Sequence, residues 1–478
     1  MKTSSTFMTV LALFTVAWPR TSLAQTTQNA PDQDGIHLHA APKPLPAGAV
    51  TADWDAFLGS QGNGQCRETK LLKRFPSAGP TLLWEVRKGT GFSSPAIGNG
   101  RVILFHRLGN TESVDCLNAL TGRRLWRFSY PTTYKDRYGF NNGPRSSPVI
   151  DNGRVYTYGV EAKLHCLNLE TGQLLWSRDL RSDFQVPPNY FGEGTSPRIW
   201  GDVLILNVGG QGGPAVIGLD KTDGHTVWQT DNQDWGASYA SPVVGKVHGQ
   251  PLAFVLAGGD VDPPTGGLLG IDLNKGAVRY RFAFRSKNYI SVNAASPVLI
   301  DDRVFLSSSY RTGGVMLALE SGGHVRQLWK TGELECHFAT PIYREGHLYG
   351  FDGSGKSDTS LVCLEASTGK LKWRHVPEWT ETLDVGGKPK DMSIGVMRGS
   401  LIWADGRFLC LGEMGHLLWL NLTPQGYEQI ARARLFWADE TWTPPAISQG
   451  LLYIMQNQSS PLDKSVRRLL CYDLRAAR

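Results

Sequence analysis

One sequence unit recurs about eight times along this 478-residue chain and constrains its fold more than any other feature. The unit begins with Ser-Pro, continues through a Gly turn and an Arg-Val pair, and ends with Thr-Gly followed by Leu-Trp. Its first copy runs from Ser94 to Trp126 and its second from Ser147 to Trp176. Later copies, the last two of them degenerate, start at or near Ser196, Ser241, Ser296, Thr340, Leu401 and Pro444. A period of about 50 residues, with several short strands in each unit, is typical of a β-propeller.

Each unit divides into four short strands, which the first copy places at 95–98, 101–106, 113–118 and 124–128. The proline that opens the unit fits an edge strand, where it removes no hydrogen bond of the sheet. Near the end of most units stands one large aromatic residue: Trp126, Trp176, Trp228, Tyr280, Trp329 and Trp373. We expect these rings to pack between neighbouring blades, because burying one tryptophan removes about 150–250 Å² of surface from water.

The two ends of the chain indicate how the ring closes. The last unit stops after a third strand at 468–474, whereas 82–86 has the pattern of a fourth strand without a blade of its own. Pairing these segments would leave no open sheet edge. The sequence therefore predicts an all-β fold: an eight-bladed β-propeller of four-stranded antiparallel blades, in which an N-terminal outer strand completes the C-terminal blade.

The residues before the propeller divide into three segments. Residues 1–24 have a basic start, a short apolar core and a small-residue end, as in a cleavable signal peptide, and no cysteine follows that would mark a lipoprotein. We expect 25–52 to be a flexible leader, 53–81 to pack on the propeller and 82–478 to form it. The protein is then exported, to the periplasm or out of the cell, without a transmembrane segment.

Charge and cysteine content narrow the interpretation further. The chain has 49 Lys and Arg against 43 Asp and Glu, without a basic block, so we expect no nucleic-acid partner. We also expect a monomer. Four cysteines occupy one position of different units, which holds a small residue in three others: Cys116, Cys166, Cys363 and Cys471, against Gly218, Gly270 and Ala318. This position predicts a small buried packing site. Three cysteines lie elsewhere, and the sequence assigns no disulfide among them: Cys66, Cys336 and Cys410.

The repeat resembles the pyrroloquinoline-quinone (PQQ) type of propeller repeat, shared by quinoprotein alcohol dehydrogenases and by the propeller lipoprotein of the bacterial outer-membrane assembly machine. The opening segments 54–64 and 79–84 are similar to those of secreted bacterial PQQ-like propeller proteins. The resemblance implies that an enzyme of this kind would hold PQQ beneath a vicinal cysteine pair and above a tryptophan, beside a calcium ion. No two cysteines are adjacent in this chain, and no Cys-x-x-Cys-His occurs. We therefore assign no cofactor; PQQ with Ca²⁺ belongs to the alternative interpretation.

Other motifs have simpler explanations. The stretch 350–357 matches the phosphate-loop pattern, but a strand at 360–365 follows where that motif needs a helix, so we interpret it as a hairpin loop. Asp260, Asp262, Asp352 and Asp358 do not complete a calcium-binding spacing. We expect His37 and His39 to be solvated, and we assign no metal site.

The candidate site lies on one face of the ring. The long connections fall on a single face, where rigid scaffolds usually carry function. Just before successive inner strands stand Arg145, Glu193, Tyr239, Asn293, His337, Arg398 and Trp442, with Asn141, Asn142, Tyr190, Trp235 and Glu335 nearby. If the ring closes, these side chains converge on a central funnel that could hold a polar or anionic ligand. They could instead neutralise one another and order water, or supply an acid and a base, such as His337 beside Glu335.

The sequence favours a non-catalytic scaffold that binds a protein, a peptide or a small polar ligand at this face. We assign no catalytic residue. Two alternatives stay open: a quinoprotein-type oxidoreductase that uses PQQ, and a hydrolase or lyase acting on a polysaccharide or cell-wall substrate.

Overall fold

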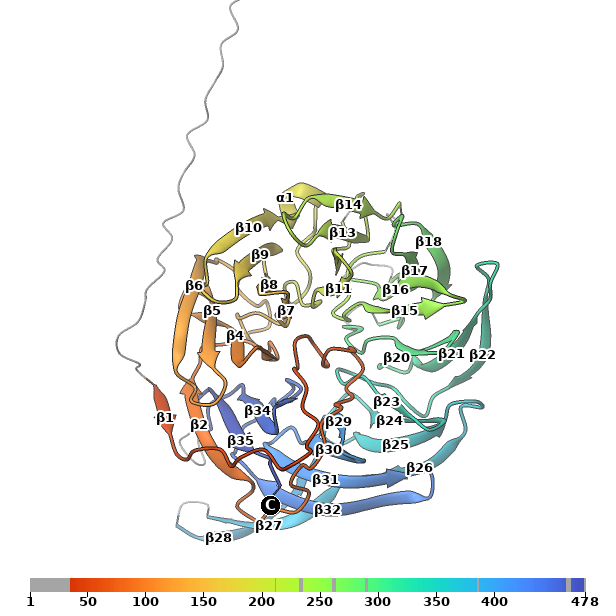
Figure 1. Ribbon diagram of the computed structural model, residues 1–478. Coiled ribbons are helices and arrows are strands. Elements are labelled where there is room, and N and C mark those ends of the chain that lie inside the picture. Colours follow the sequence, from red (N-terminus) through yellow and green to blue (C-terminus); the bar gives the residue numbers. More distant parts are fainter. Residues whose placement is uncertain are drawn as a thin grey trace, which may run out of the picture.

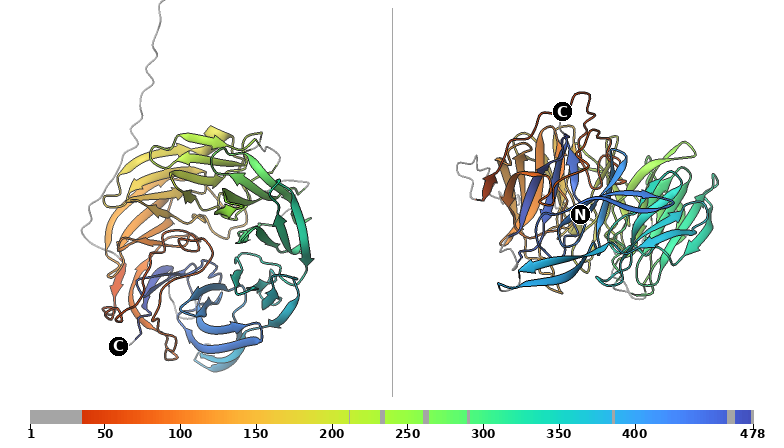
Figure 2. Two further views of the ribbon diagram at one scale, coloured as in Figure 1. Left: turned by 45° about the vertical axis from the view of Figure 1, so that its right-hand side comes forward. Right: turned by 90° about the horizontal axis from the view of Figure 1, so that it is seen from below.

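Eight antiparallel sheets stand as blades around one axis, seven of four strands and one of five (Figures 1 and 2). This computed structural model describes residues 35–476 apart from 211, 232–234, 260–263, 289–290, 385–386 and 461–465. The expected signal peptide at 1–24, and the pair Asp260 and Asp262, lie outside the described residues. The predicted eight-bladed, all-β propeller is confirmed.

The first four blades follow one another along the chain, each from its inner to its outer strand. Blade 1 consists of β3 (Ala96–Gly98), β4 (Arg101–Leu108), β5 (Thr111–Asn118) and β6 (Arg124–Pro131). Blade 2 consists of β7 (Val149–Asp151), β8 (Arg154–Tyr158), β9 (Lys163–Asn168) and β10 (Leu174–Asp179), followed by the short helix α1 (Leu180–Phe184). Blades 3 and 4 consist of β11 (Arg198–Trp200), β12 (Val203–Asn207), β13 (Val216–Asp220) and β14 (Thr226–Gln229), then β15 (Val243–Val247), β16 (Gln250–Ala257), β17 (Gly267–Asp272) and β18 (Val278–Ala283).

The next three blades continue the ring, with one insertion. Blade 5 consists of β19 (Val298–Ile300), β20 (Arg303–Ser308), β21 (Gly313–Leu319) and β22 (Val325–Thr331), and blade 6 of β23 (Ile342–Arg344), β24 (His347–Asp352), β25 (Ser360–Glu365) and β26 (Leu371–His375). A separate hairpin of β27 (Glu378–Asp384) and β28 (Pro389–Gly395) follows, which the repeat did not predict. Blade 7 consists of β29 (Ser400–Ala404), β30 (Arg407–Leu411), β31 (His416–Thr423) and β32 (Gly426–Arg434).

Blade 8 joins the two ends of the chain. Its inner strands are β33 (Ala446–Ser448), β34 (Leu451–Gln456) and β35 (Arg468–Asp473), and β2 (Thr81–Arg87) pairs antiparallel with β35. Trp84 lies opposite Cys471 in this register, so the predicted ring closure is confirmed. A short strand, β1 (Ile36–Leu38), pairs with the outer edge of β2. Part of the segment expected to be a flexible leader is therefore a fifth strand, because β2 offers it an unpaired edge.

The large aromatic residues connect neighbouring blades by hydrogen bonds as well as by packing. The indole N–H of Trp126 donates to the carbonyl of Leu169, just beyond the third strand of the next blade, at 2.9 Å. The same bond recurs from Trp84 to Ala119, Trp176 to Lys221, Trp228 to Leu273, Trp329 to Ala366 and Trp373 to Thr423, with the Tyr280 hydroxyl bonding to Glu320. The glycine of the Thr-Gly pair lies under the ring: a Cβ on Gly172 would come within 2.6 Å of Trp126.

The small residue predicted opposite each outer-strand aromatic residue is also present, except in blade 5. Cys116, Gly218 and their equivalents lie opposite the outer-strand aromatic residue. In blade 5 the residue opposite Trp329 is Met316, and Ala318 lies opposite Arg326. The repeat spacing was misleading here because three more residues separate Met316 from Trp329 than separate Cys116 from Trp126. All seven cysteines are buried free thiols.

The Ser-Pro motif builds a second set of contacts between blades, close to the axis. The hydroxyl oxygen of Ser147 accepts a hydrogen bond from the backbone N–H of Ser94 in the preceding blade, at 3.0 Å. The same bond joins the next four neighbours, Ser147 to Ser196, Ser196 to Ser241, Ser241 to Ser296 and Ser296 to Thr340. A hydroxyl at this position therefore satisfies a buried backbone donor, which explains why threonine can replace serine.

Candidate functional site

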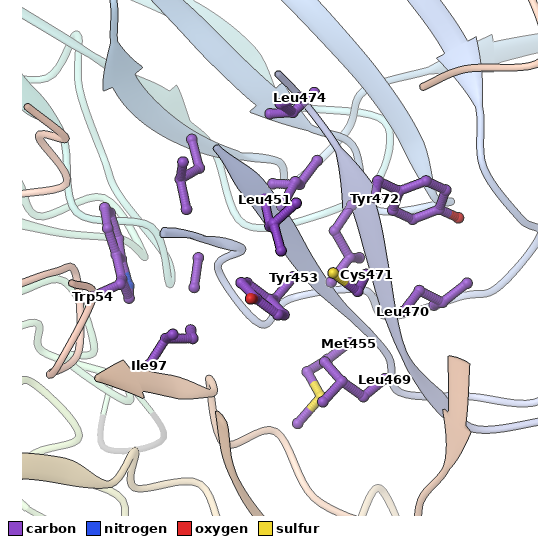
Figure 3. Packing of buried hydrophobic residues seen from close by; sticks show 14 of the residues in the cluster. Trp54, Ile97, Leu451, Tyr453, Met455, Leu469, Leu470, Cys471, Tyr472 and Leu474 are labelled. Carbon is purple, nitrogen blue, oxygen red and sulfur yellow. The ribbon is translucent and has the colours of Figure 1, made fainter. Parts of the chain in front are cut away.

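A segment that precedes the propeller crosses the end of the ring that carries the short turns. Residues 53–72, called the strap below, run from blade 8 across the ring, as the red trace in Figure 1 shows. The strap bonds to six blades on or directly after their inner strands, through Ile97, Ile150, Arg198, Tyr343, Trp403 and Gln449–Gly450. Figure 3 shows Trp54 of the strap beside Ile97 and near the buried side chains of blade 8. The strap therefore occupies this face at six of the eight blades, and the predicted site residues lie on the opposite, loop-rich face.

One buried carboxylate fixes the strap to blade 8. Glu68 accepts hydrogen bonds from the backbone N–H groups of Ala52, Gln449 and Gly450. Burial raises the pKa of Glu68, although these bonds oppose the shift. The strap also fills the seam between blades 7 and 8, since Leu72 accepts a bond from the Trp419 indole at 2.9 Å and donates to the carbonyl of Leu474 at 2.6 Å. At this seam the tryptophan stands on β31, opposite Ala431, so the strap supplies the link that an outer-strand tryptophan makes elsewhere.

On the loop-rich face, several of the predicted residues meet through aromatic side chains. Trp442, which precedes blade 8, stacks on Phe92 with the ring centroids 5.3 Å apart and lies 4.7 Å from Phe338. Phe338 in turn stacks on His337 at 3.8 Å. Residues that enter blades 1, 6 and 8 are therefore in contact above the axis. Phe92 was missed, although it stands as far before Pro95 as Arg145 stands before Pro148.

Arg145 is held by a buried carboxylate. Its guanidinium lies 2.7 Å from Asp136 and also donates to the carbonyl of Asn141. The Asp136 carboxylate is fully buried and accepts the backbone N–H groups of Tyr138 and Asn141 as well. The guanidinium carbon stands 5.9 Å from the Phe92 ring centroid and 5.6 Å from that of Phe191, within the range of cation–π attraction. The positive charge of Arg145 is thus already compensated.

Arg398 has a matching environment on the other side of Trp442. It forms two hydrogen bonds to Glu413, at 2.5 and 3.0 Å, and lies over the Trp442 ring at 4.7 Å. The Trp442 indole donates to the same Glu413 carboxylate at 2.9 Å. Glu413 is fully buried, so one carboxylate satisfies both the arginine and the tryptophan. Phe191, Arg145, Phe92, Trp442, Arg398, Phe338 and His337 form one connected group, which we call the mouth stack.

The remaining predicted residues lie at the ends of the mouth stack or beside it. The nitrogen Nε2 of His337 faces the Tyr310 hydroxyl at 3.2 Å, and burial together with Arg398 lowers the pKa of His337 to about 4. Glu335, the carboxyl group of the acid–base alternative, accepts the backbone N–H of Arg311. Asn293 accepts the hydroxyl of Ser308 at 2.8 Å, away from the connected rings.

Tyr239 and Glu193 lie next to each other beyond Phe191. The Tyr239 hydroxyl accepts the backbone N–H of Phe191 at 2.6 Å, and burial raises its pKa. Glu193 is 1% exposed, and burial raises its pKa to about 8. At neutral pH neither His337 nor Glu193 carries a full charge. Of the two predicted arginines, each is paired with its own carboxylate. The site therefore fits the alternative in which the charged side chains neutralise one another better than it fits a site for an anionic ligand.

In the loop that connects blades 1 and 2, sequence reasoning indicated Asn141 and Asn142 but missed two exposed aromatic residues. Tyr138 and Phe140 are 48% and 46% exposed, and Tyr138 stacks on Tyr190 with centroids 4.7 Å apart. Arg107, itself buried, donates to the carbonyls of Tyr134 and Asn142 at the two ends of this loop. We call Tyr138, Phe140, Tyr190 and Phe191 the aromatic rim. The concentration of aromatic and turn residues in 134–142 was the available signal.

Other candidate motifs have structural explanations. Residues 353–359 connect β24 to β25, as expected of a hairpin loop, and Asp352 accepts bonds from Arg374 and from the backbone of Glu335. One group that could hold a metal occurs in the part of the chain that the structure describes, on an outer turn of blade 3: Asp220, Asp223 and His225. Asp220 and Asp223 already accept the backbone N–H groups of Thr222 and His225. No helix in the described ranges has the length and hydropathy required to cross a bilayer.

The residues at the mouth do not fit the quinone site that the repeat implies. The indole of Trp442 has Phe92 and Phe338 as ring neighbours and Arg398 above it. Asp136 and Glu413, the carboxylates beside the mouth stack, are used by the two arginines. Cys116, Cys166, Cys363 and Cys471 lie on third strands of separate blades, opposite the outer tryptophans.

Comparison with known proteins relates the chain to two kinds of propeller. One curated relative is the dehydrogenase subunit of alcohol dehydrogenase (quinone) from Gluconobacter oxydans, which is 24% identical over 365 residues. The match covers 69% of this chain but only 45% of that protein, so this chain spans less than half of its length. The solved BamB of Moraxella catarrhalis superimposes with a TM-score of 0.54 at 16% identity, over 83% of this chain and 100% of that one. The quinohemoprotein alcohol dehydrogenase of Comamonas testosteroni gives 0.58 at 12% identity, over 89% and 81%. The model of the family described as outer membrane protein assembly factor BamB matches residues 110–375, more than half of the sequence, and the chain therefore belongs to that family.

Proposed function

We propose that this protein is an exported, non-catalytic scaffold that binds a peptide segment of a partner protein on its aromatic rim. The observation that carries the proposal is the exposure of Tyr138 and Phe140 at the tip of an ordered loop. Aromatic side chains fixed before binding supply contact area at a small entropic cost. Arg107 and Asp136 provide that order, through bonds to both ends of the loop and to its interior. Membership in a family named for an assembly factor supports a protein partner.

The charges at the mouth favour an apolar or uncharged segment over an anionic ligand. Arg145 and Arg398 are each neutralised by a buried carboxylate, so an incoming anion would have to displace Asp136 or Glu413. Separating a buried ion pair costs about 3–5 kcal/mol, and the contacts of an anion bound at the surface do not compensate for this loss. The exposed rings can be covered without breaking either pair. The partner segment therefore binds over the mouth stack and does not insert into it.

Site-specific photo-crosslinking tests this proposal. A photoreactive phenylalanine analogue replaces Phe140 in cells that make the protein, and the same analogue replaces Val227, which is 46% exposed on the outer strand β14. We expect a discrete crosslinked partner from position 140 that is absent from position 227. Binding of the partner, once identified, should fall at least tenfold in the double variant Y138A/F140A. Crosslinks that are equal at the two positions, or binding that the double variant keeps, would refute the proposal.

The quinone-dependent relative supports a second candidate, a PQQ-dependent oxidoreductase. This candidate predicts that PQQ and Ca²⁺ added to the purified protein give a bound-cofactor absorbance and dye-linked oxidation of an alcohol. The scaffold proposal predicts neither signal. Detection of either one, with loss of the signal in a Trp442→Ala variant, would replace the scaffold by the enzyme.

A further inference from the structure

Glu193 lies among buried polar atoms that lack hydrogen-bond partners, between blades 2 and 3. Its oxygen Oε1 has no partner among the described residues, and neither have the hydroxyls of Tyr134 and Tyr158. Tyr158 is fully buried at the end of β8, and Nε of Arg181 is likewise unpaired within the described part of the chain. Buried polar groups in proteins are nearly always paired, so several unpaired groups in one place indicate a bound molecule. We call Glu193, Tyr134, Tyr158 and Arg181 the Glu193 cluster.

Aromatic rings pack against the two glycines that flank Glu193 in the chain. A Cβ on Gly192 would lie 3.2 Å from the ring carbon Cζ of Tyr134, and one on Gly194 would lie 2.5 Å from Cδ1 of Tyr239. Both glycines thus leave space for a ring on either side of Glu193. Negative charge on Glu193 contributes to the raised pKa values of Tyr134, Tyr158 and Tyr239, after the larger effect of burial. The pKa values of three tyrosines therefore depend on the charge of this one carboxyl group.

The nearest positive charge does not complete the site. A guanidinium nitrogen of Arg181 stands 3.8 Å from Oε1, beyond hydrogen-bond distance, and the arginine side chain is partly exposed while the carboxyl is not. The other charged groups near the cluster are Arg145, which is bound to Asp136, Arg137, which lies over the Tyr190 ring, and Asp179, which caps α1. The backbone of Asn189 also donates toward this carboxyl group, whereas Oε1 has no hydrogen-bond partner among the described residues. Tyrosine hydroxyls offer further acceptor oxygens, and ring faces attract cations.

We propose that the Glu193 cluster binds a primary ammonium group, from either a free alkylamine or a lysine side chain of a partner. The three N–H bonds of an ammonium match the unpaired oxygens of Glu193, Tyr134 and Tyr158, and its charge replaces the proton on the carboxyl group. Tyr134 and Arg181 are only partly buried, whereas the carboxyl group of Glu193 is fully buried. The ligand enters by displacing these two side chains. The site lies beneath the aromatic rim but does not require the peptide partner proposed above.

Proton release gives a specific test. Because burial raises the pKa of Glu193 to about 8, the carboxyl group is mostly protonated at pH 7, and a bound cation must ionise it. Titration calorimetry with methylammonium chloride at pH 7, in phosphate and in HEPES, should show release of about 0.9 proton per ligand. The release should fall to about 0.1 proton at pH 9, where the group is already ionised. Sodium chloride at equal ionic strength should give no such release.

Two variants and one control complete the test. Glu193→Gln keeps the shape of the side chain and should abolish both binding and proton release. Tyr158→Phe removes one acceptor oxygen and should weaken binding about fivefold to tenfold. Glu335→Gln, a carboxylate elsewhere on the same face, should bind methylammonium as the natural chain does. If the natural chain shows no binding beyond the sodium control, then Arg181 or ordered water pairs with Glu193, and the proposal is wrong.

A capped Ala-Lys-Ala peptide and its ε-acetylated form separate the two sources of the ammonium group. Binding of the lysine peptide alone assigns the site to a partner side chain, and binding of methylammonium alone assigns it to a free amine. Crosslinking at Phe140 is scored separately. Failure of the ammonium site therefore leaves the rim proposal intact, and failure of the rim leaves the ammonium site intact.

Discussion

A matched pair of glycine substitutions isolates what the tryptophan contacts contribute between blades. Gly172 and Gly153 both lie in turns of blade 2, with φ of +71° and +74°. An alanine at either position must adopt the left-handed backbone conformation, which destabilises the protein by about 1–2 kcal/mol. At Gly153 the new Cβ meets nothing within 4 Å, whereas at Gly172 it would stand 2.6 Å from the Trp126 ring. Gly172→Ala must therefore displace the indole as well.

The size of the difference follows from what the indole does. Overpacking a close-packed contact costs about 1–3 kcal/mol, and weakening the bond from Trp126 to the Leu169 carbonyl adds about 0.5–1.5 kcal/mol. We therefore expect Gly153→Ala to lower the free energy of unfolding by about 1–2 kcal/mol and Gly172→Ala by about 3–6 kcal/mol.

Urea unfolding followed by tryptophan fluorescence measures both variants under the same conditions. The native emission of Gly172→Ala should also shift to the red, because Trp126 becomes more exposed, while that of Gly153→Ala should not change. Equal losses in the two variants would show that only the backbone conformation matters. The contact between blades would then contribute nothing measurable.

Three further predictions concern buried carboxyl groups. Glu413→Gln should destabilise the protein by about 3 kcal/mol in urea unfolding, because it leaves the charge of Arg398 unpaired; an unchanged midpoint would contradict the ion pair. Burial alone would raise the pKa of Asp115, but hydrogen bonds from Arg127 and His106 outweigh it and lower the pKa to about 2. At pH 7 the natural chain should therefore have a free energy of unfolding about 2 kcal/mol higher than that of Asp115→Asn. This difference should disappear as the pH falls from about 4 to about 2, because the carboxylate becomes protonated. A difference independent of pH would refute this. Glu68→Ala leaves three backbone N–H groups unpaired, so limited proteolysis should cut the strap faster than in the natural chain while β2 stays protected.

The repeat predicted those parts of the fold that depend on the same residue types in each blade. Ser147 and Trp126 each make their bond to a neighbouring blade, and the equivalent positions of other units do the same. The pairing of β2 with β35 followed from counting strands at the two ends of the chain. Such contacts are periodic, so one copy of the unit indicates the geometry of the others.

The parts that the sequence did not predict are those that occur only once. The hairpin of β27 and β28 replaces a loop between blades 6 and 7, and Trp419 stands on β31 where the repeat has it on the outer strand. The strap follows no period, and its course is set by contacts such as those of Glu68 with blade 8. A single sequence gives no pattern from which such long-range pairings can be read.

The candidate site shows the same division, with a consequence for function. Position before the inner strands led to the prediction of Arg145, Arg398 and Trp442, but nothing in the repeat indicated their partners Asp136 and Glu413, which lie in connections that vary in length from unit to unit. Those two carboxylates compensate the charges of Arg145 and Arg398. Recognition is then left to the groups that remain exposed or unpaired, which are the aromatic rim and Glu193. The double variant D136N/E413Q should therefore bind the partner more weakly at the aromatic rim, because loss of Asp136 disorders the loop that carries Tyr138 and Phe140. Tighter binding of the partner would instead show that the freed arginines are the recognition groups.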